Sequence, residues 1–113
     1  HTIVADRLAN DMKPLTIETV SDDLVIKDAM RTVAIYHLRG NPHSDTLLML
    51  HLPAERVLIE ADAFNPGDAT NPYAANLLDE ITRRRLQVER IVPLHGAVVA
   101  LSELEQFVDS QTK

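Results

Sequence analysis

The chain has 113 residues, of which 45% are apolar and 25% are charged. That length suits one domain, and these proportions are typical of a globular protein, which excludes a disordered tail or a fibrous repeat. The 17 Asp and Glu residues outnumber the 11 Lys and Arg residues and give a formal net charge of −6. A field of that sign repels phosphate backbones and anionic lipid headgroups, so we expect neither nucleic acid nor a membrane as a partner.

The sequence contains no apolar run long enough to span a bilayer, and its first residues lack the basic and apolar regions of a signal peptide. We therefore expect a soluble chain, in a compartment that the sequence does not specify. The chain has no Cys, so any bound transition metal would need His and carboxylate ligands. Residues 1–113 carry no linker or repeat, and we expect them to form a single domain.

Helical spacing of apolar residues predicts an amphipathic helix over 2–12, which Pro14 ends. Shorter β-like runs follow, separated by short polar links, and predict an antiparallel meander. These runs are 16–20, 24–28 and 32–38. The next two runs, 46–52 and 56–62, flank a turn that contains Pro53 and predict the clearest hairpin of the chain.

Asn71 and Pro72 are typical of a helix N-cap and of the position after it, so a helix is predicted over 72–86. Its apolar residues form one stripe, and three arginines crowd its last turn, where cations complement the helix dipole. A short buried strand is predicted over 91–94. The order strand, helix, strand makes a βαβ unit, so this strand should run parallel to the second hairpin strand.

Ser102 and Glu105 predict a capping box that opens a last helix over 102–110. The elements together predict an α/β (α+β) class, with a mixed, mostly antiparallel sheet, one βαβ crossover and helices mainly on one face. Because the hairpin strands are apolar on both faces, the sheet needs cover on two sides. We expect a second copy of the chain to cover the open face in a homo-oligomer, unless the helix over 2–12 folds across it.

The chain has five histidines: His1, His37, His43, His51 and His95. His37 and His51 lie inside predicted strands, where a packed or half-exposed histidine is more common than a ligand. His1 is terminal and is expected to be frayed. The other two histidines lie in loops directly at strand ends, where rigid elements position functional side chains.

The predicted topology brings His43, Asp62 and His95 to one edge of the sheet. The hairpin register sets His43 near Asp62, and the parallel crossover brings His95 to the same edge. Two imidazoles and a carboxylate are a sensible half of a zinc or iron site, in which the carboxylate could bridge two ions. Spacing alone does not exclude a simpler interpretation than a metal site, in which Asp62 caps a loop.

Three segments together resemble the C-terminal half of the metallo-β-lactamase superfamily: GNPHSD (40–45), LLMLHLPAERVLIEAD (47–62) and IVPLHG (91–96). In that family a histidine precedes a strand that ends in an "LP" turn, the next strand ends in a bridging aspartate, and a late histidine sits in a "P-x-H-G" segment. These positions fall on His43, Asp62 and His95. The resemblance covers roughly residues 16 to 108, and it implies one half of a four-layer αββα sandwich.

The sequence differs from the family pattern in two respects. The family's H-x-H-x-D-H motif occurs nowhere in these residues, and Ala61 stands where a glycine commonly precedes the aspartate. The resemblance therefore implies the C-terminal portion of a binuclear zinc hydrolase, inactive on its own. His43 would be a terminal ligand of one ion, Asp62 the bridge and His95 a terminal ligand of the other. The alternatives are a non-catalytic homo-oligomerising or binding module with a vestigial metal site, and a plain structural domain.

Overall fold

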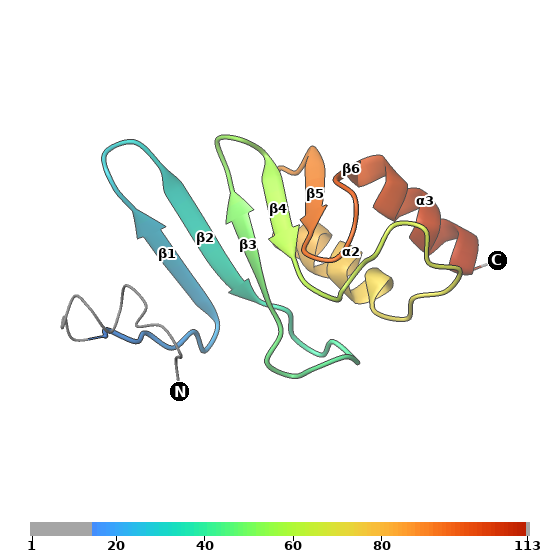
Figure 1. The fold of residues 1–113 in the computed structure, drawn as a ribbon, viewed down its shortest axis with the longest axis horizontal. Coiled ribbons are helices and arrows are strands. Elements are labelled where there is room, and N and C mark those ends of the chain that lie inside the picture. Colours follow the sequence, from blue (N-terminus) through green and yellow to red (C-terminus); the bar gives the residue numbers. More distant parts are fainter. Residues whose placement is uncertain (1–14, 113) are drawn as a thin grey trace, which may run out of the picture.

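The computed structural model describes residues 15–112, so the helix predicted over 2–12 lies outside the described residues. Within that range the chain forms one sheet, and its helices follow the fourth and the sixth strands (Figure 1). The elements are β1 (Asp23–Lys27), β2 (Thr32–His37), β3 (Leu48–Leu52), β4 (Val57–Glu60), α2 (Ala74–Arg83), β5 (Arg90–Pro93), β6 (Val99–Ala100) and α3 (Leu101–Gln111).

The strands are ordered β1-β2-β3-β4-β5-β6 in the sheet, which is also their order along the chain. Neighbouring strands are antiparallel except β4 and β5, which are parallel and are connected through α2. The hairpin and the βαβ crossover predicted from the sequence are thus confirmed. The sequence pattern does not predict β6, which is only two residues long.

The run at 16–20 is not a strand, and this part of the predicted meander is wrong. Its β-branched residues favour extended backbone, but a strand also needs a neighbour to pair its N–H and C=O groups. In the described part of the chain no strand lies beside this run, and Ile17 is 75% exposed. The sheet as described therefore begins at β1.

The hairpin of β3 and β4 has the predicted register, with Leu52 paired to Val57. Arg56 completes the turn with a φ of 56°. The second strand ends at Glu60, two residues earlier than predicted, because Asp62 adopts a φ of 66° that an extended strand does not contain.

The helix predicted over 72–86 is shorter at both ends. α2 begins at Ala74, and its N-cap residue is Tyr73 rather than Asn71. Asn71 Oδ1 accepts a hydrogen bond of 2.9 Å from Tyr73 N, so the side chain closes a turn ahead of the helix instead of capping it. At the other end, Arg85 has a φ of 56° and turns the chain away.

The capping box predicted for the last helix does not form. α3 begins at Leu101, so Ser102 already lies inside its first turn and cannot cap it with Glu105. Ala100 is the N-cap residue, with extended backbone and no side-chain cap. The pairing of β6 with β5 holds Ala100 extended opposite Arg90, and this pairing fixes where the helix starts.

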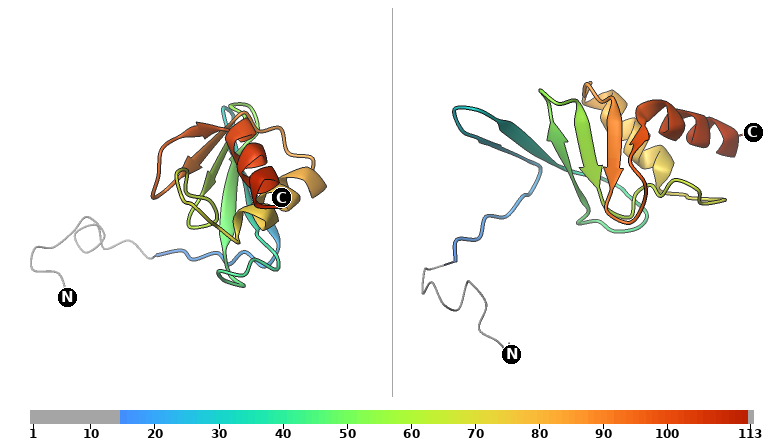
Figure 2. Two further views of the ribbon diagram at one scale, coloured as in Figure 1. Left: turned by 90° about the vertical axis from the view of Figure 1, so that its right-hand side faces the viewer. Right: turned by 45° about the horizontal axis from the view of Figure 1, so that its top comes forward.

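One face of the sheet carries the hydrophobic core, and both helices pack on that face (Figure 2). The core is built from buried side chains of the sheet, α2 and α3, among them Met49, Leu58, Ile91, Leu77, Ile81 and Leu104. The predicted class, with helices mainly on one side of a mixed sheet, is confirmed. Neither helix in residues 15–112 has the length and apolar composition that crossing a bilayer requires.

The other face of the sheet has no helix against it within residues 15–112. Apolar side chains of adjacent strands pair in register and form a row across this face. The row, which we call the open face, consists of Leu24, Ile35, Leu50, Ile59 and Val92, all half-buried. An apolar sheet face without a covering layer is the arrangement that the sequence predicted.

Candidate functional site

Three loops meet at one edge of the sheet, and each carries one candidate metal ligand. β4 and β5 are parallel, so Asp62 and His95, each two residues beyond its strand, emerge at the same edge. β3 is antiparallel to β4 and begins at that edge, so the preceding loop brings His43 there as well. Topology alone therefore gathers the three side chains, as the sequence predicted.

Each carboxylate oxygen of Asp62 faces one imidazole. His95 Nδ1 lies 2.8 Å from Asp62 Oδ1, and His43 Nε2 lies 3.8 Å from Asp62 Oδ2. The side chains of His43 and Asp62 are 40% and 41% exposed, and that of His95 is 65% exposed. In the tautomer that carries a proton on Nδ1, His95 donates this hydrogen bond to the Asp62 carboxyl group.

Backbone contacts fix the loop that carries Asp62. Its φ of 66° lies in the left-handed region, which Asp tolerates better than most residues. The next two residues, Ala63 and Phe64, are buried, and their N–H groups both donate to Oε2 of Glu60, at 2.9 and 3.2 Å. The aspartate side chain thus extends to solvent from a segment that is anchored in the core.

Glu60 is a buried acid that the sequence-based prediction overlooked. It is the last residue of β4 and is 1% exposed. Burial raises the pKa of Glu60 to about 7, although the N–H groups of Ala63 and Phe64 act in the opposite direction. The signal in the sequence was strand alternation, because Glu60 shares the inward face with Leu58, where an acid is unexpected.

The loop that carries His43 is fixed by a buried amide, which the sequence-based prediction also overlooked. Asn41 is 2% exposed; its Oδ1 accepts from His43 N at 2.9 Å, and its Nδ2 donates to Asn76 Oδ1 on α2 at 2.9 Å. The imidazole of His43 packs edge-on against Tyr73, with ring centroids 5.1 Å apart. Asn41 therefore connects the ligand loop to the helix layer.

The two strand histidines contact backbone carbonyl oxygens rather than Asp62. His51 is 4% exposed, and its Nε2 is 2.9 Å from the carbonyl oxygen of Gln87, as a packed structural histidine would be. His37 Nε2 contacts the carbonyl oxygen of Asp45. His1 lies outside the described residues.

The three side chains are of the types that bind zinc or iron, but they are too few for a stable site. Within residues 15–112 no group of three or more His, Cys, Asp or Glu side chains is arranged to hold a metal ion. Because Asp62 has one imidazole at each oxygen, an ion at either position would gain two protein ligands, whereas stable zinc sites usually have three or four. Within the described residues the cluster therefore does not form a metal site by itself.

An apolar groove of about 360 Å³ adjoins the cluster. It is lined by Ser44, Thr46, Leu47, Leu48, Leu50, Ile59, Glu60, Ala61 and Leu94. Three of these residues, Ser44, Ala61 and Leu94, are the immediate neighbours of the three candidate ligands. The groove thus connects the open face to the edge at which the ligands gather.

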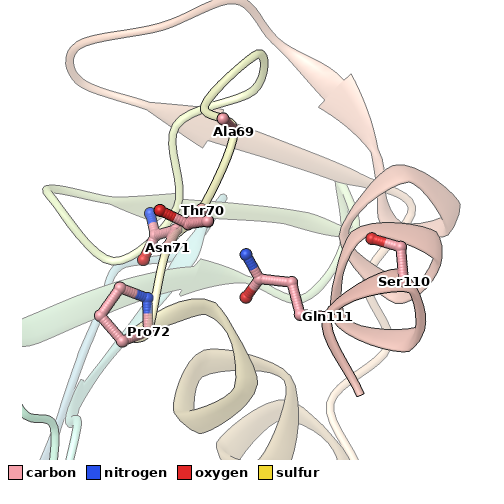
Figure 3. Close-up of a pocket in the computed structure, with 6 residues that line it drawn as sticks. All are labelled: Ala69, Thr70, Asn71, Pro72, Ser110 and Gln111. Atoms are coloured by element: carbon pink, nitrogen blue, oxygen red, sulfur yellow. The ribbon is translucent and has the colours of Figure 1, made fainter. Parts of the chain in front are cut away.

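A wider, open pocket of about 560 Å³ lies between the loop before α2 and the end of α3 (Figure 3). It is lined by Ala69, Thr70, Asn71, Pro72, Ser110 and Gln111, none of which is charged. The Gln111 amide points at the loop (Figure 3), and with its nitrogen and oxygen exchanged it donates to Asn71 O at 3.0 Å and accepts from Asn71 N at 2.9 Å. These bonds join the end of the helix to the loop. None of the residues that line the pocket belongs to the His and Asp cluster.

Comparison with known proteins identifies the fold. No family model matches the sequence, and no curated protein matches it significantly. Solved structures do match, among them a metallo-β-lactamase from Pontibacter korlensis, with a TM-score of 0.61 and 18% identity over 94% of this chain and 54% of that one. The rubredoxin:oxygen oxidoreductase of Desulfovibrio gigas has a TM-score of 0.66 and 20% identity over 88% of this chain and 33% of its own.

The flavodiiron protein of Giardia intestinalis is similar too, with a TM-score of 0.64 and 13% identity over 94% of this chain and 34% of that one. The chain therefore spans between 33% and 54% of the length of these three proteins. It has about half of the metallo-β-lactamase fold. A shared fold at these identities does not by itself assign a reaction.

Proposed function

We propose that the chain is the C-terminal half of a metal-dependent hydrolase of the metallo-β-lactamase superfamily, and that His43, Asp62 and His95 are its share of a site for two metal ions. The observation that carries the proposal is the pairing of each Asp62 oxygen with one imidazole, at the edge of a sheet with this fold. A carboxylate placed between two imidazoles suits a bridge between two ions, with one histidine on each.

In this proposal the other half of the fold supplies the remaining ligands and covers the open face. Two observations support that division. Within the described residues the three side chains do not complete a metal site, and no layer covers the half-buried row of the open face. The bound ions would supply Lewis acidity toward a carbonyl or phosphoryl oxygen and would lower the pKa of a water molecule. The chain by itself is inactive, because it holds only part of this site.

Zinc is the first metal to test, because two imidazoles and a carboxylate are common zinc ligands. Iron is the second, because a rubredoxin:oxygen oxidoreductase and a flavodiiron protein are among the similar structures. The three ligand residues would have the same role with zinc as with iron. Asp62 places its carboxyl group at the centre of the cluster, and the loops of His43 and His95 hold one imidazole on either side.

The test begins with the reading frame upstream of residue 1. If it encodes no H-x-H-x-D-H motif, the proposal fails. With the motif present, a protein that spans both halves is expected to retain two zinc ions per chain by elemental analysis after dialysis, and Asp62→Ala is expected to lower this to one or fewer. Asp68→Ala is the matched control, because Asp68 is an exposed loop aspartate outside the cluster. Equal zinc contents in both variants would also count against the proposal.

A second candidate function rests on the open face. As the alternative we propose a non-catalytic module that forms a homodimer, in which the three ligand residues are vestigial. Two copies stacked sheet on sheet, about 10 Å apart, would bury the row that includes Leu50 and Ile59 on both protomers through one isologous contact. A stable dimer in a protein whose reading frame lacks the upstream motif would favour this alternative.

A further inference from the structure

All the hydrogen bonds of the buried Glu60 carboxylate go to one loop. Oε2 accepts from the N–H groups of Ala63 and Phe64, while Oε1 has no partner in the described part of the chain. Glu60 pairs with Met49 across the sheet and is 1% exposed, so water does not solvate the acid. An apolar side chain would fill this position without burying an unsatisfied oxygen, so core packing alone does not account for a glutamate here.

The two hydrogen bonds of Glu60 span Asp62. They connect the end of β4 to the residues that follow Asp62, and they close the segment 61–64 into a tight loop in which Asp62 has its φ of 66°. Phe64 anchors the far end of the loop, with its ring centroid 5.3 Å from that of Phe107 on α3. Asp62 is left between two imidazoles with a backbone that is fixed on both sides.

We propose that Glu60 is a positioning residue, which holds the loop so that Asp62 faces His95 and His43. This role rests on the proposed function, since it gives Asp62 the fixed geometry that a bridging ligand needs, but the hydrogen bonds themselves require no metal. A ligand that is held in place before an ion binds loses little freedom when the ion arrives. Glu60 thus serves the site although it is a poor core residue.

The test is NMR spectroscopy of the whole 113-residue chain without metal. The readout is the ring ¹⁵N and Nδ1–H signals of His95, which report its hydrogen bond to Asp62, and Asp62→Ala provides the reference for a His95 without that partner. Glu60→Leu is expected to move these signals to the reference and to speed amide exchange of Ala63 and Phe64 at least about tenfold. Glu60→Gln keeps an acceptor oxygen for both N–H groups and is expected to retain the parent signals.

Leu58→Ala is the matched control for lost stability, because Leu58 is fully buried on the same strand and the same face as Glu60. It is expected to lower the urea midpoint and to leave the His95 signals in place. If circular dichroism shows that Glu60→Leu does not fold, Glu60→Asp replaces it with the same expectation, because its side chain is too short to reach both N–H groups.

Parent-like His95 signals in the Leu or Asp variant would overturn the proposal. An equal displacement of those signals in Leu58→Ala would overturn it too, because the effect would then follow from lost stability alone. No metal enters this experiment, so its result is independent of whether the proposed hydrolase site is correct.

Discussion

Arg84 and Asp23 are joined by a hydrogen bond of 2.7 Å between Nη1 and Oδ1, although 61 residues separate them in the sequence. Arg84 is the C-cap residue of α2, and its side chain is 11% exposed. Its Nε also donates to Glu80 Oε2 at 2.9 Å, and its guanidinium lies 4.5 Å from the ring centroid of Tyr36 on β2. This side chain therefore ties the β1–β2 hairpin to the helix layer.

Arg84→Ala is expected to lower the free energy of unfolding by about 2 kcal/mol, because it breaks a largely buried ion-pair network. Arg83→Ala is the matched control. Arg83 bonds the same Glu80 carboxylate, but its side chain is 53% exposed, so we expect a loss below about 1 kcal/mol. Urea denaturation measures both losses, and equal values would contradict the role assigned to Arg84.

Glu80 is expected to make the fold sensitive to acid. Burial acts to raise the pKa of Glu80, but hydrogen bonds from Arg83 and Arg84 outweigh it and hold the pKa below its usual value of 4.5. A carboxyl with a lowered folded-state pKa stabilises the fold above its unfolded pKa, and this contribution is lost as the pH falls through the folded pKa. The free energy of unfolding should therefore fall as the pH drops below about 4.5.

Glu80→Gln isolates this contribution from the other titrating groups. The variant should be less stable than the parent at neutral pH, and the difference should shrink as the pH falls below about 4.5. Urea denaturation of the two proteins across this range measures the difference. A gap that stays constant with pH would show that Glu80 titrates alike in the folded and unfolded chains.

Asn41→Ala is expected to lower the free energy of unfolding by about 2 kcal/mol and to release His43 from Tyr73, because two hydrogen bonds of a buried amide are lost. The second effect is visible as the loss of nuclear Overhauser contacts between the two rings. Asn65→Ala is the control, because Asn65 Oδ1 is buried without a partner in residues 15–112. The idea fails if the ring contacts survive in the Asn41 variant.

The isolated chain is expected to bind zinc weakly or not at all. His43, Asp62 and His95 divide between two metal positions, so each ion gains at most two protein ligands. Calorimetry should detect no submicromolar affinity. For the same reason we expect no turnover of ester, lactam or thioester substrates, and tight zinc binding by a monomer would show that the site is complete.

The isolated chain is also expected to form a homodimer or a larger assembly through the open face. Leu50→Asp places a charge in the middle of that face, opposite Ile59, and should give a monomer. Met30→Asp is the control, because Met30 is 87% exposed in the turn between β1 and β2, away from the row. Light scattering at micromolar concentration measures the mass, and a monomeric parent would refute the assembly.

The position of the candidate site could be predicted because it depends on topology. A short turn fixes the hairpin register, and the helix crossover fixes the direction of β5, so the loops of His43, Asp62 and His95 have one edge in common. Neither constraint depends on the detailed contacts of any side chain. Hydrophobic pattern and element order were therefore sufficient.

The errors arose where a turn or a strand pairing outweighs the preference of a residue for a helix cap. Asn71 has the chemistry of an N-cap, but its side chain closes the turn before α2. Ser102 would cap α3, but the pairing of β6 moves the start of the helix to Leu101. A cap contributes about 1 kcal/mol, which a strand pairing or a turn readily exceeds. The role of Glu60 depends on contacts with residues that follow it in a loop, and hydrophobic patterning contains no such information.

The order of the strands has a consequence for how the chain folds. Within residues 15–112 every strand pairs with its neighbour along the chain, and among these pairs only β4 and β5 must come together across a helix. Pairings of this kind close short loops, lose little chain entropy and favour rapid folding. The sheet can therefore form by successive pairing of strands that are neighbours along the chain. In a longer polypeptide, each half of such a sandwich could form as a separate kinetic unit, and docking of the two preformed sheets would come last.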